Sequence, residues 1–481
     1  MIPLTFAEIS KVTGGTLTQL DPTRITTAVP VIDSRKAGLG TFFVALPGER
    51  VDGNMYCTEA ISAGAEFVFC TEAMNVPSVL VKDTLAALTA LAKYAREKME
   101  HTTFIGLTGS QGKTTTKDLL NHILSSHGKT VSPVGSFNNE IGVPVTVLSC
   151  FEDTTFCIVE MGARHSGEIE FLSTIAKPQI GLVLVVGTAH MGEFGSQEAI
   201  AKTKAELIDS LPESGVAILG RYDTFTPQMG AQKKIKRTFF GETSDCQIRA
   251  ADIETREGRA HFDLVTPAGR APVSLRLLGL HQVANALAAA AVATELGIQI
   301  DSIAAALSTA DNASKWRMEL HDEGGILIVN DSYNANPEST AAALRTLALL
   351  AQERGGVSWA FLGKMLELGE SEGEDHRRIG RLASDLGIDQ LVCVGTDWYL
   401  DGLELDFDAG DEMTTHYFLT QEEALGITKY FSDGDVVLIK ASRAEHLEEL
   451  AEKIIATAAL RQVNELEELE EVEEVEEDGE K

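Results

Sequence analysis

Short apolar runs alternate with helical patterns through residues 101–314 of the chain. The runs that predict buried strands are Phe104–Leu107, Phe156–Glu160, Gly181–Val186 and Val216–Leu219. Such alternation favours a parallel sheet with helices on both faces. Residues 237–278 instead alternate apolar and polar positions with a period of two, which predicts an antiparallel edge.

The segments on either side of residues 101–314 also contain strand and helix patterns. Residues 1–100 contain short strand and turn patterns, with helices predicted near residues 56–64 and over residues 84–100. Residues 315–463 repeat the strand and helix alternation and predict a second open sheet. We therefore expect an α/β protein with three domains: a small N-terminal domain, a central parallel-sheet domain and a C-terminal Rossmann-like domain.

Charge changes the interpretation of the C-terminus. The formal net charge is −32, and eleven acidic residues and one lysine between Glu465 and Lys481 supply −10 of it. Like charges three and four residues apart oppose helix formation, so we expect residues 464–481 to be an acidic disordered tail, with a partner-binding segment as the alternative. So acidic a chain is a poor general binder of nucleic acid, because phosphate backbones are repelled.

Composition also indicates where in the cell the protein is located. The longest aliphatic run is Leu182 to Val186, far below the ~20 residues that span a bilayer. The first fifteen residues lack a basic region followed by an apolar core, so we expect neither a signal peptide nor membrane insertion. The six cysteines include no Cys-x-x-Cys pair, which fits a reducing compartment. The sequence predicts a cytoplasmic protein.

A glycine-rich loop in "FIGLTGSQGKTTTKDLL", residues 104–120, is the strongest chemical signal. Gly112, Lys113 and Thr114 have the order of a phosphate-binding loop, but the usual glycine five positions before Gly112 is replaced by Leu107. An apolar run precedes the loop and a helical pattern follows it. Backbone amides at this helix start could wrap an anion, whereas a plain Gly/Ser turn is the alternative. The candidate phosphate-binding residues are Gly109, Ser110, Gln111, Gly112, Lys113, Thr114 and Thr115.

This loop and four later blocks together resemble the Mur ligase family, ATP-dependent amide ligases that build the peptide of the bacterial cell wall. The blocks are "SFNNEIGVP" (136–144), "VEMGARHSGEI" (159–169), "GTAHMGEFGSQEAIAKTKAELI" (187–208) and "GLHQVANALAAAAVA" (279–293). Ser136 stands where many members have Asn. The resemblance implies that a carboxylate is activated as an acyl phosphate and then attacked by an amine.

Three further blocks narrow the resemblance within the family. "DSRKAGLGTFFVALPGERVDGN" resembles a nucleotide-sugar domain, and "NDSYNANPEST" with "LGKMLELGE" resembles the member that adds a dipeptide. The implied substrates are ATP, UDP-N-acetylmuramoyl-tripeptide and D-alanyl-D-alanine, and we expect a monomer. The third residue of the tripeptide, lysine or diaminopimelate, stays open. Lys364 and Ala441 depart from the usual Asp and Gly, which leaves open any contact made by the Lys364 loop.

Three alternatives remain. One is the sister ligase that adds diaminopimelate or lysine, although its Asp-Asn-Pro-Arg sequence is absent. Another is a polyglutamate ligase, which the first domain argues against. The last is a nucleotide-binding regulatory module without turnover.

The resemblance also implies roles for individual residues. Mg²⁺ would be held by Thr114, Glu160, His190 and Lys204, with Lys204 carbamylated to remove its positive charge. The alternatives without a metal are a surface acid at Glu160, a structural histidine at His190 and an exposed lysine at Lys204. Lys113 would lie between the β- and γ-phosphates of ATP.

The remaining implied contacts are spread over the three domains. ATP would touch Asn285, Asp331, Tyr333 and Asn334, with Arg317 at the γ-phosphate side; a packing amide is the alternative for Asn285. The substrate contacts would be Ser34 and Arg35 for the uridine diphosphate, Asn138 and Asn139 beside the loop, and Ser442 and Arg443 for the dipeptide. Because the ligands fall on three domains, we expect catalysis to require closure of residues 315–463.

Overall fold

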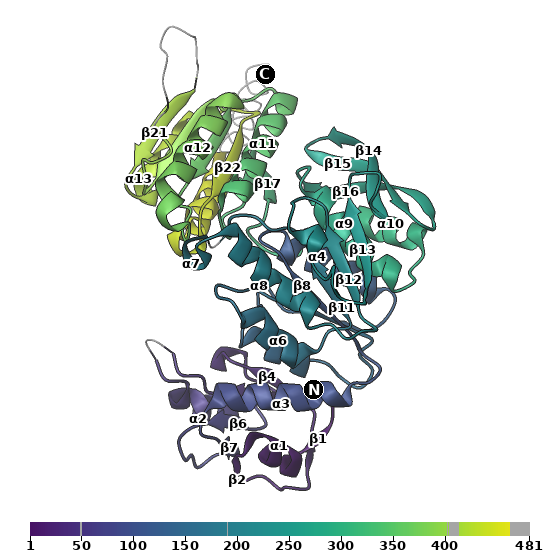
Figure 1. Ribbon diagram of the computed structural model, residues 1–481. Helices are drawn as coiled ribbons and strands as arrows, with labels where there is room; N and C mark the ends of the chain where they lie inside the picture. The colour runs from purple at the N-terminus through teal and green to yellow at the C-terminus, as the bar shows by residue number, and fades with distance from the viewer. Residues whose placement is uncertain (49–50, 190, 402, 404–412, 462–481) are drawn as a thin grey trace, which may run out of the picture.

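The computed structural model describes residues 1–48, 51–189, 191–401, 403 and 413–461. Three lobes follow one another along the molecule, with the N-terminal lobe at one end and the C-terminal lobe at the other (Figure 1). Each lobe is built on its own main sheet. Within the described residues, no helix has both the length and the apolar character needed to cross a membrane.

The N-terminal lobe has a five-stranded sheet in the order β2-β7-β6-β5-β4 and a two-stranded sheet of β1 and β3. Phenylalanines fill its core, and the rings of Phe42 and Phe67 stack with centroids 4.6 Å apart. The elements are β1 (Leu4–Thr5), α1 (Phe6–Thr13), β2 (Thr16–Thr18), β3 (Ile25–Thr26), β4 (Val29–Val31), β5 (Thr41–Val44), α2 (Cys57–Ser62), β6 (Val68–Cys70), β7 (Ser78–Leu80) and α3 (Thr84–Lys98).

Helix α3 joins this lobe to the next. The buried guanidinium of Arg96 donates to the backbone oxygens of Ala176 and Lys177, at 2.7 and 2.8 Å, and stacks on Phe104. These acceptors lie at the end of α6 (Glu168–Ala176) in the central lobe. The first two lobes are therefore tied through a buried, charge-assisted contact.

The central lobe has a nine-stranded sheet in the order β16-β15-β14-β13-β12-β11-β8-β10-β9. Helices α4, α9 and α10 cover one face, and α5, α6 and α8 cover the other. The elements besides α6 are β8 (Thr103–Thr108), α4 (Lys113–Ser125), β9 (Thr130–Val131), α5 (Gly142–Leu148), β10 (Phe156–Glu160), β11 (Ile180–Val183), α7 (Met191–Phe194), α8 (Gln197–Asp209), β12 (Val216–Gly220), β13 (Lys236–Gly241), β14 (Ile248–Arg256), β15 (Arg259–Thr266), β16 (Gly269–Leu278), α9 (Gln282–Glu295) and α10 (Ile300–Thr309).

The strand directions in this sheet match most of the sequence patterns. Strand β8 pairs in parallel with β10 and β11, and β14, β15 and β16 pair antiparallel with one another. The antiparallel edge predicted from residue 237 was placed too early, because β13 pairs in parallel with β12 and β14. The predicted strand at Gly181–Val186 was too long at its end, because β11 stops at Val183. Leu184 still donates its backbone N–H to Thr108, but the chain then leaves the sheet and lines the cavity described below.

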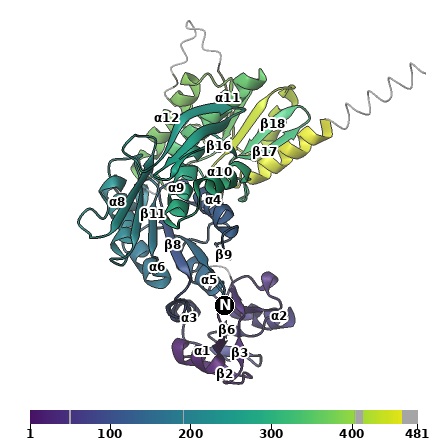
Figure 2. The same ribbon diagram turned by 90° about the vertical axis from the view of Figure 1, so that its right-hand side faces the viewer.

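The C-terminal lobe has a six-stranded sheet in the order β17-β18-β22-β19-β20-β21. Helices α11 and α12 cover one face, and a helix over 448–461 covers the other, beside β17 and β18 (Figure 2). The elements are β17 (Glu319–Glu323), β18 (Ile326–Asn330), α11 (Pro337–Arg354), β19 (Ser358–Leu362), α12 (Glu372–Asp385), β20 (Gln390–Val394), β21 (Thr414–Phe418), α13 (Gln421–Leu425) and β22 (Val436–Lys440).

Helix α11 begins as the sequence indicates. Asn336 caps it by accepting from the backbone N–H of Ser339 at 2.8 Å, and Pro337 occupies the first helical position. The predicted tail, residues 464–481, lies outside the described residues.

Candidate active site

A cavity of about 1360 Å³ lies between the central and C-terminal lobes. It opens where β8, β10, β18 and β22 end, which is the edge at which open α/β sheets bind ligands. It gathers most of the site residues predicted from the sequence: Ser110, Gln111, Gly112, Lys113, Thr114, Thr115, Asn138, Asn139, Glu160, Lys204, Asn285, Arg317, Asp331, Tyr333, Asn334, Ser442 and Arg443.

Three predicted residues do not line this cavity, and one cannot be placed. Gly109 lies at the start of the loop, and Ser34 and Arg35 lie in the N-terminal lobe. The Arg35 guanidinium pairs with Asp33 at 2.8 Å and its side chain is exposed. His190 lies outside the described residues.

The glycine-rich loop joins β8 to α4. Gly112 has a φ of 80° at the N-cap of the helix, and a Cβ there would lie 2.2 Å from Oδ1 of Asn285. Only glycine fits both restraints. Lys113 folds back, and its Nζ donates to the backbone oxygen of Gly109 at 2.8 Å. The loop therefore encloses a lysine at the start of a helix, which is an anion-binding arrangement.

Glu160 is buried at the end of β10, so it is not a surface acid. Its Oε1 accepts from Nδ2 of Asn138 at 2.9 Å and from Oγ1 of Thr114 at 3.5 Å. Its Oε2 is buried and has no hydrogen-bond partner. A buried carboxylate oxygen without a partner is costly unless a cation or donor binds there.

Lys204 on α8 is buried and lines the same cavity, whereas Lys202 on that helix is exposed. The alternative of an exposed lysine at position 204 is therefore wrong. Burial, followed by the nearby charge of Lys113, lowers the pKa of Lys204 to about 7. A substantial neutral fraction of this amine is present near neutral pH.

Within the part of the chain that the structure describes, no three His, Cys, Asp or Glu side chains gather closely enough to hold a metal. At the phosphate-binding loop, the Glu160 carboxylate and the Thr114 hydroxyl line the cavity and are oxygen donors suited to a hard cation. Mg²⁺ needs few protein ligands, because it keeps several waters and takes phosphate oxygens. The residues present fit Mg²⁺ bound together with a nucleotide.

Arg317 reaches the loop from the linker, residues 310–318, which joins α10 to β17. Its guanidinium lies 4.0 Å from the ring centroid of Tyr333, and its Nη2 donates to Oγ of Ser136 at 3.2 Å. Ser136 lies 3.2 Å from Oγ1 of Thr114. The linker thus delivers a cation to the phosphate-binding end of the cavity.

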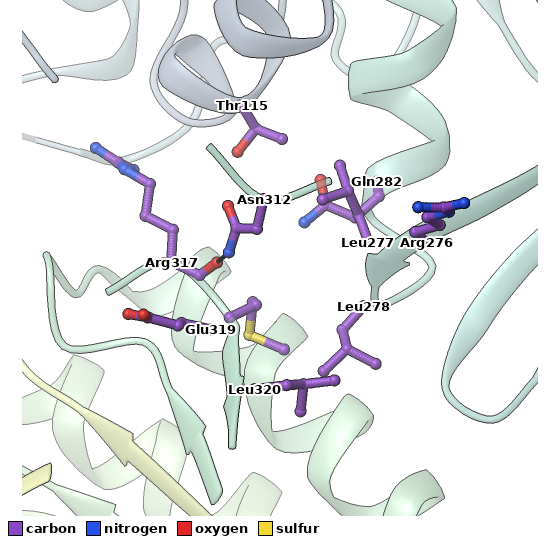
Figure 3. Close-up of a pocket in the computed structure, with 10 residues that line it drawn as sticks. Thr115, Arg276, Leu277, Leu278, Gln282, Asn312, Arg317, Glu319 and Leu320 are labelled. Carbon is purple, nitrogen blue, oxygen red and sulfur yellow. Dashed lines mark hydrogen bonds between the residues drawn. The ribbon is translucent and has the colours of Figure 1, made fainter. Parts of the chain in front are cut away.

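A second cavity of about 270 Å³ lies behind this guanidinium (Figure 3). Thr115 and Gln282 line it from the central lobe and Leu320 lines it from β17, while the Arg317 side chain extends away from these residues. Nδ2 of Asn312 donates to the backbone oxygen of Arg317 at 2.5 Å, which fixes the backbone at this point.

Asp331 at the end of β18 is already engaged by the protein. Its Oδ2 accepts from Nζ of the buried Lys440 at 2.5 Å, and its Oδ1 accepts from the backbone N–H of Met318 at 3.1 Å. The same Nζ donates to the backbone oxygen of Asn334 at 2.8 Å. This network holds the linker and the loop after β18 in one arrangement beside the cavity.

Ser442 and Arg443 follow β22. Oγ of Ser442 accepts from the backbone N–H of Leu366 at 2.9 Å, so this hydroxyl orders the neighbouring loop. The Ala441 methyl is accommodated by Gly363, where a Cβ would lie 2.8 Å from it. Lys364 lies with its ammonium 4.9 Å from the ring centroid of Trp398 and does not line the main cavity. The departure at Lys364 therefore falls outside this cavity.

Glu338 was missed by sequence reasoning. It lies in the first turn of α11, and its Oε1 accepts from the backbone N–H and the hydroxyl of Thr188, at 2.9 and 2.7 Å. It contacts a loop 150 residues away in the chain. An acid in a first helical turn is common on helix-dipole grounds alone, so its sequence position carried no signal of this contact.

Comparison with known proteins decides the family. The Mur ligase family catalytic domain matches residues 31–100, the Mur ligase middle domain matches residues 107–293, and the Mur ligase glutamate ligase domain matches residues 316–443. The UDP-N-acetylmuramoyl-tripeptide–D-alanyl-D-alanine ligase of Mycobacterium tuberculosis is 39% identical, over 95% of this chain and 98% of that protein. The chain belongs to the Mur ligase family.

Solved structures of Mur ligases agree. MurF from Acinetobacter baumannii matches with a TM-score of 0.82 and 32% identity, over 94% of this chain and 99% of that chain. MurF ligase from Thermotoga maritima, in complex with ADP, matches with a TM-score of 0.76 and 28% identity, over 90% and 99% of the two chains. The predicted Mur ligase resemblance and the predicted three-part α/β fold are confirmed.

Proposed function

We propose that this Mur ligase family member is an ATP-dependent ligase that joins D-alanyl-D-alanine to UDP-N-acetylmuramoyl-tripeptide in cytoplasmic peptidoglycan precursor synthesis. The observation that carries the proposal is the nearly full-length similarity to a ligase of that name. The main cavity supports it, because the phosphate-binding loop, Glu160 and Arg443 all line one space.

The reaction begins with an unreactive carboxylate. An oxygen of the tripeptide's terminal carboxylate attacks the γ-phosphorus of ATP, which gives an acyl phosphate and ADP. The amine of the dipeptide then attacks the acyl carbon, the tetrahedral intermediate collapses, phosphate leaves and an amide remains. Several anionic groups converge in these steps, so the site must supply cations and fixed dipoles.

Lys113, the loop amides and Arg317 supply that field from this chain. The Lys113 ammonium belongs between the β- and γ-phosphates, while Arg317 reaches the γ-phosphate side over Thr114 and Ser136. Asn285, Tyr333 and Asn334 line the same cavity and are proposed to contact ATP. Both carboxylate oxygens of Asp331 are bonded to the protein, so we assign it to positioning the linker and Lys440.

We propose Thr114 and Glu160 as Mg²⁺ ligands, on the evidence of the unpartnered Oε2 of Glu160. Bound Mg²⁺ would neutralise phosphate charge. Lys204 would join them as a carbamate, since its lowered pKa favours the neutral amine that reacts with CO₂.

Glu160→Gln should weaken Mg²⁺-dependent nucleotide binding in a folded protein, measured by calorimetry; unchanged binding would remove Glu160 from this role.

The three ligands are assigned to different domains. We propose that residues 1–100 hold the uridine diphosphate through Ser34 and Arg35, that residues 101–314 hold ATP, and that residues 315–463 hold the dipeptide. Asn138, which donates to Glu160, and Asn139 both line the cavity, and we propose that they contact the precursor's peptide end. Arg443 suits the dipeptide's carboxylate, because a guanidinium binds carboxylates through paired hydrogen bonds.

Phosphate release measured with single amine acceptors tests the proposal. With ATP, Mg²⁺ and UDP-N-acetylmuramoyl-tripeptide, we expect release with D-alanyl-D-alanine and none with lysine, diaminopimelate or glutamate. Release with diaminopimelate or lysine and a dipeptide precursor would instead select the sister ligase. Absence of release with every acceptor would favour a regulatory nucleotide-binding protein. Tripeptides ending in lysine and in diaminopimelate should both be supplied.

A further inference from the structure

The Arg443 guanidinium is held on two sides at the edge of the main cavity. It lies 4.4 Å from the ring centroid of Trp316, and its Nη1 lies 2.5 Å from Oε1 of Glu448. The Arg443 side chain is nevertheless 45% exposed and lines the cavity. A cation over an aromatic face and beside a carboxylate loses much of its rotational freedom.

Trp316 holds its position through an unusual backbone. Its φ is +60°, which a bulky residue rarely adopts. Its N–H donates to Oε2 of Glu319 at 2.9 Å, and its backbone oxygen accepts from the N–H of Tyr333 at 3.0 Å. Such a conformation persists only where the surroundings fix it. These contacts fix the Trp316 backbone, and its indole packs against the Arg443 guanidinium.

Glu448 orients Arg443 and leaves it able to bind another anion. The Glu448 side chain is 8% exposed, and its second oxygen is buried without a hydrogen-bond partner. Among the described residues, Glu448 is the one carboxylate that forms an ion pair with Arg443. A guanidinium carries five N–H donors, so this contact leaves enough of them for a second carboxylate.

We propose that Trp316 is a positioning residue that sets selectivity for the carboxylate of the acceptor, by holding Arg443 in the orientation that binds it. This inference rests on the proposed function and deepens it. The neighbouring Arg317 reaches toward Thr114 and Ser136. Two adjacent linker residues thus place one guanidinium for the phosphate end and support another for the acceptor, which aligns the two reacting groups.

The test compares two acceptors in three variants. Acceptor-dependent phosphate release is measured with D-alanyl-D-alanine and with its C-terminal amide, which lacks the carboxylate charge. Trp316→Leu removes the aromatic face, and Trp316→Phe keeps one. Trp398→Leu is the matched control, since Trp398 also lies under a cation, Lys364, but neither residue lines the main cavity.

We expect Trp316→Leu to lower the preference for the free carboxylate, as the ratio of kcat/KM values, about threefold to tenfold. The change should fall mainly on KM for the dipeptide. Trp316→Phe and Trp398→Leu should keep the wild-type ratio. Equal losses with both acceptors in Trp316→Leu, or an unchanged ratio, would overturn the inference and leave the proposed function standing. A wild-type protein inactive with both acceptors would overturn the proposed function itself.

Discussion

Nη2 of Arg317 donates to Oγ of Ser136 across 181 residues of sequence, at 3.2 Å. Ser136 in turn lies 3.2 Å from the hydroxyl of Thr114. The linker before β17 is therefore joined directly to the start of the phosphate-binding helix. Any rotation of the C-terminal lobe must carry Arg317 toward or away from bound phosphates.

Arg317→Lys should lower kcat about 10²-fold. The guanidinium directed at the transition-state charge is replaced by an ammonium group that reaches less far and has a different donor geometry. Ser136→Ala should cost less, about tenfold, since it removes the acceptor of a charge-assisted hydrogen bond from Arg317, worth about 1.5 kcal/mol. Steady-state phosphate release checks both. Near-normal turnover by Arg317→Lys would mean that this guanidinium does not act on the transferring phosphoryl group.

The two lobes also meet at a pair of glycines. Gly192 on α7 donates its backbone N–H to the oxygen of Glu367 at 3.2 Å, and a Cβ on Gly369 would lie 2.6 Å from Cα of Gly192. Gly387 supplies a matched control. It has the same φ of +68° as Gly369, but a Cβ there would meet nothing within 4 Å.

Alanine at Gly369 or at Gly387 should each cost about 1 kcal/mol of stability, because both glycines have a positive φ. Only Gly369→Ala should also lower kcat, by about 10-fold or more, because its methyl group forces the lobes apart at the cavity. Thermal melts and turnover measured together separate the two effects. If both variants lose the same activity, the Gly192 contact has no role in closure.

His376 links α12 to the loop after β19. Its Nε2 accepts from the backbone N–H of Met365 at 3.0 Å, so the ring proton is on Nδ1 and donates to the oxygen of Glu372 at 2.6 Å. Burial lowers the pKa of His376 from 6.5, and Lys364 adds to this, while hydrogen bonding to Glu372 and the charges of Glu372 and Asp375 oppose it. Protonation of Nε2 would break the bond to Met365.

Stability should therefore fall on acidification. Below pH 6.5 the unfolded chain binds a proton at His376 while the folded chain does not, so the free energy of unfolding decreases until the lower folded-state pKa is reached. His376→Gln should be less stable than wild type at about pH 7.5, and the gap should narrow at about pH 5.5. Thermal melts at the two pH values check this. A gap that widens on acidification contradicts the assigned tautomer.

The phosphate-binding loop and the main sheets could be predicted from the sequence, because both have local signals. Gly112, Lys113 and Thr114 are adjacent in the chain, and the apolar runs of β8 and β10 mark strands buried on both faces. The extent of β11 was missed, because Leu184 stays apolar after the chain leaves the sheet. Hydrophobicity alone does not separate a buried strand from a buried cavity wall.

Contacts between residues far apart in the chain had no local signal. Thr188 and Glu338 are 150 residues apart and join the central and C-terminal lobes, whereas Trp316 and Arg443 come from segments beside β17 and β22 of one sheet. Neither pair follows from spacing or composition, because the first depends on how two lobes pack and the second on the strand order of the C-terminal sheet. The roles assigned to the cavity residues stay predictions until they are measured.

Transfer of ¹⁸O tests the central claim most directly. Both oxygens of the terminal carboxylate of UDP-N-acetylmuramoyl-tripeptide are labelled, and the phosphate released with D-alanyl-D-alanine is analysed by mass spectrometry. If the carboxylate takes the γ-phosphoryl group of ATP, each phosphate carries one ¹⁸O and the new amide keeps the other. Unlabelled phosphate released in step with peptide formation would contradict the acyl phosphate route.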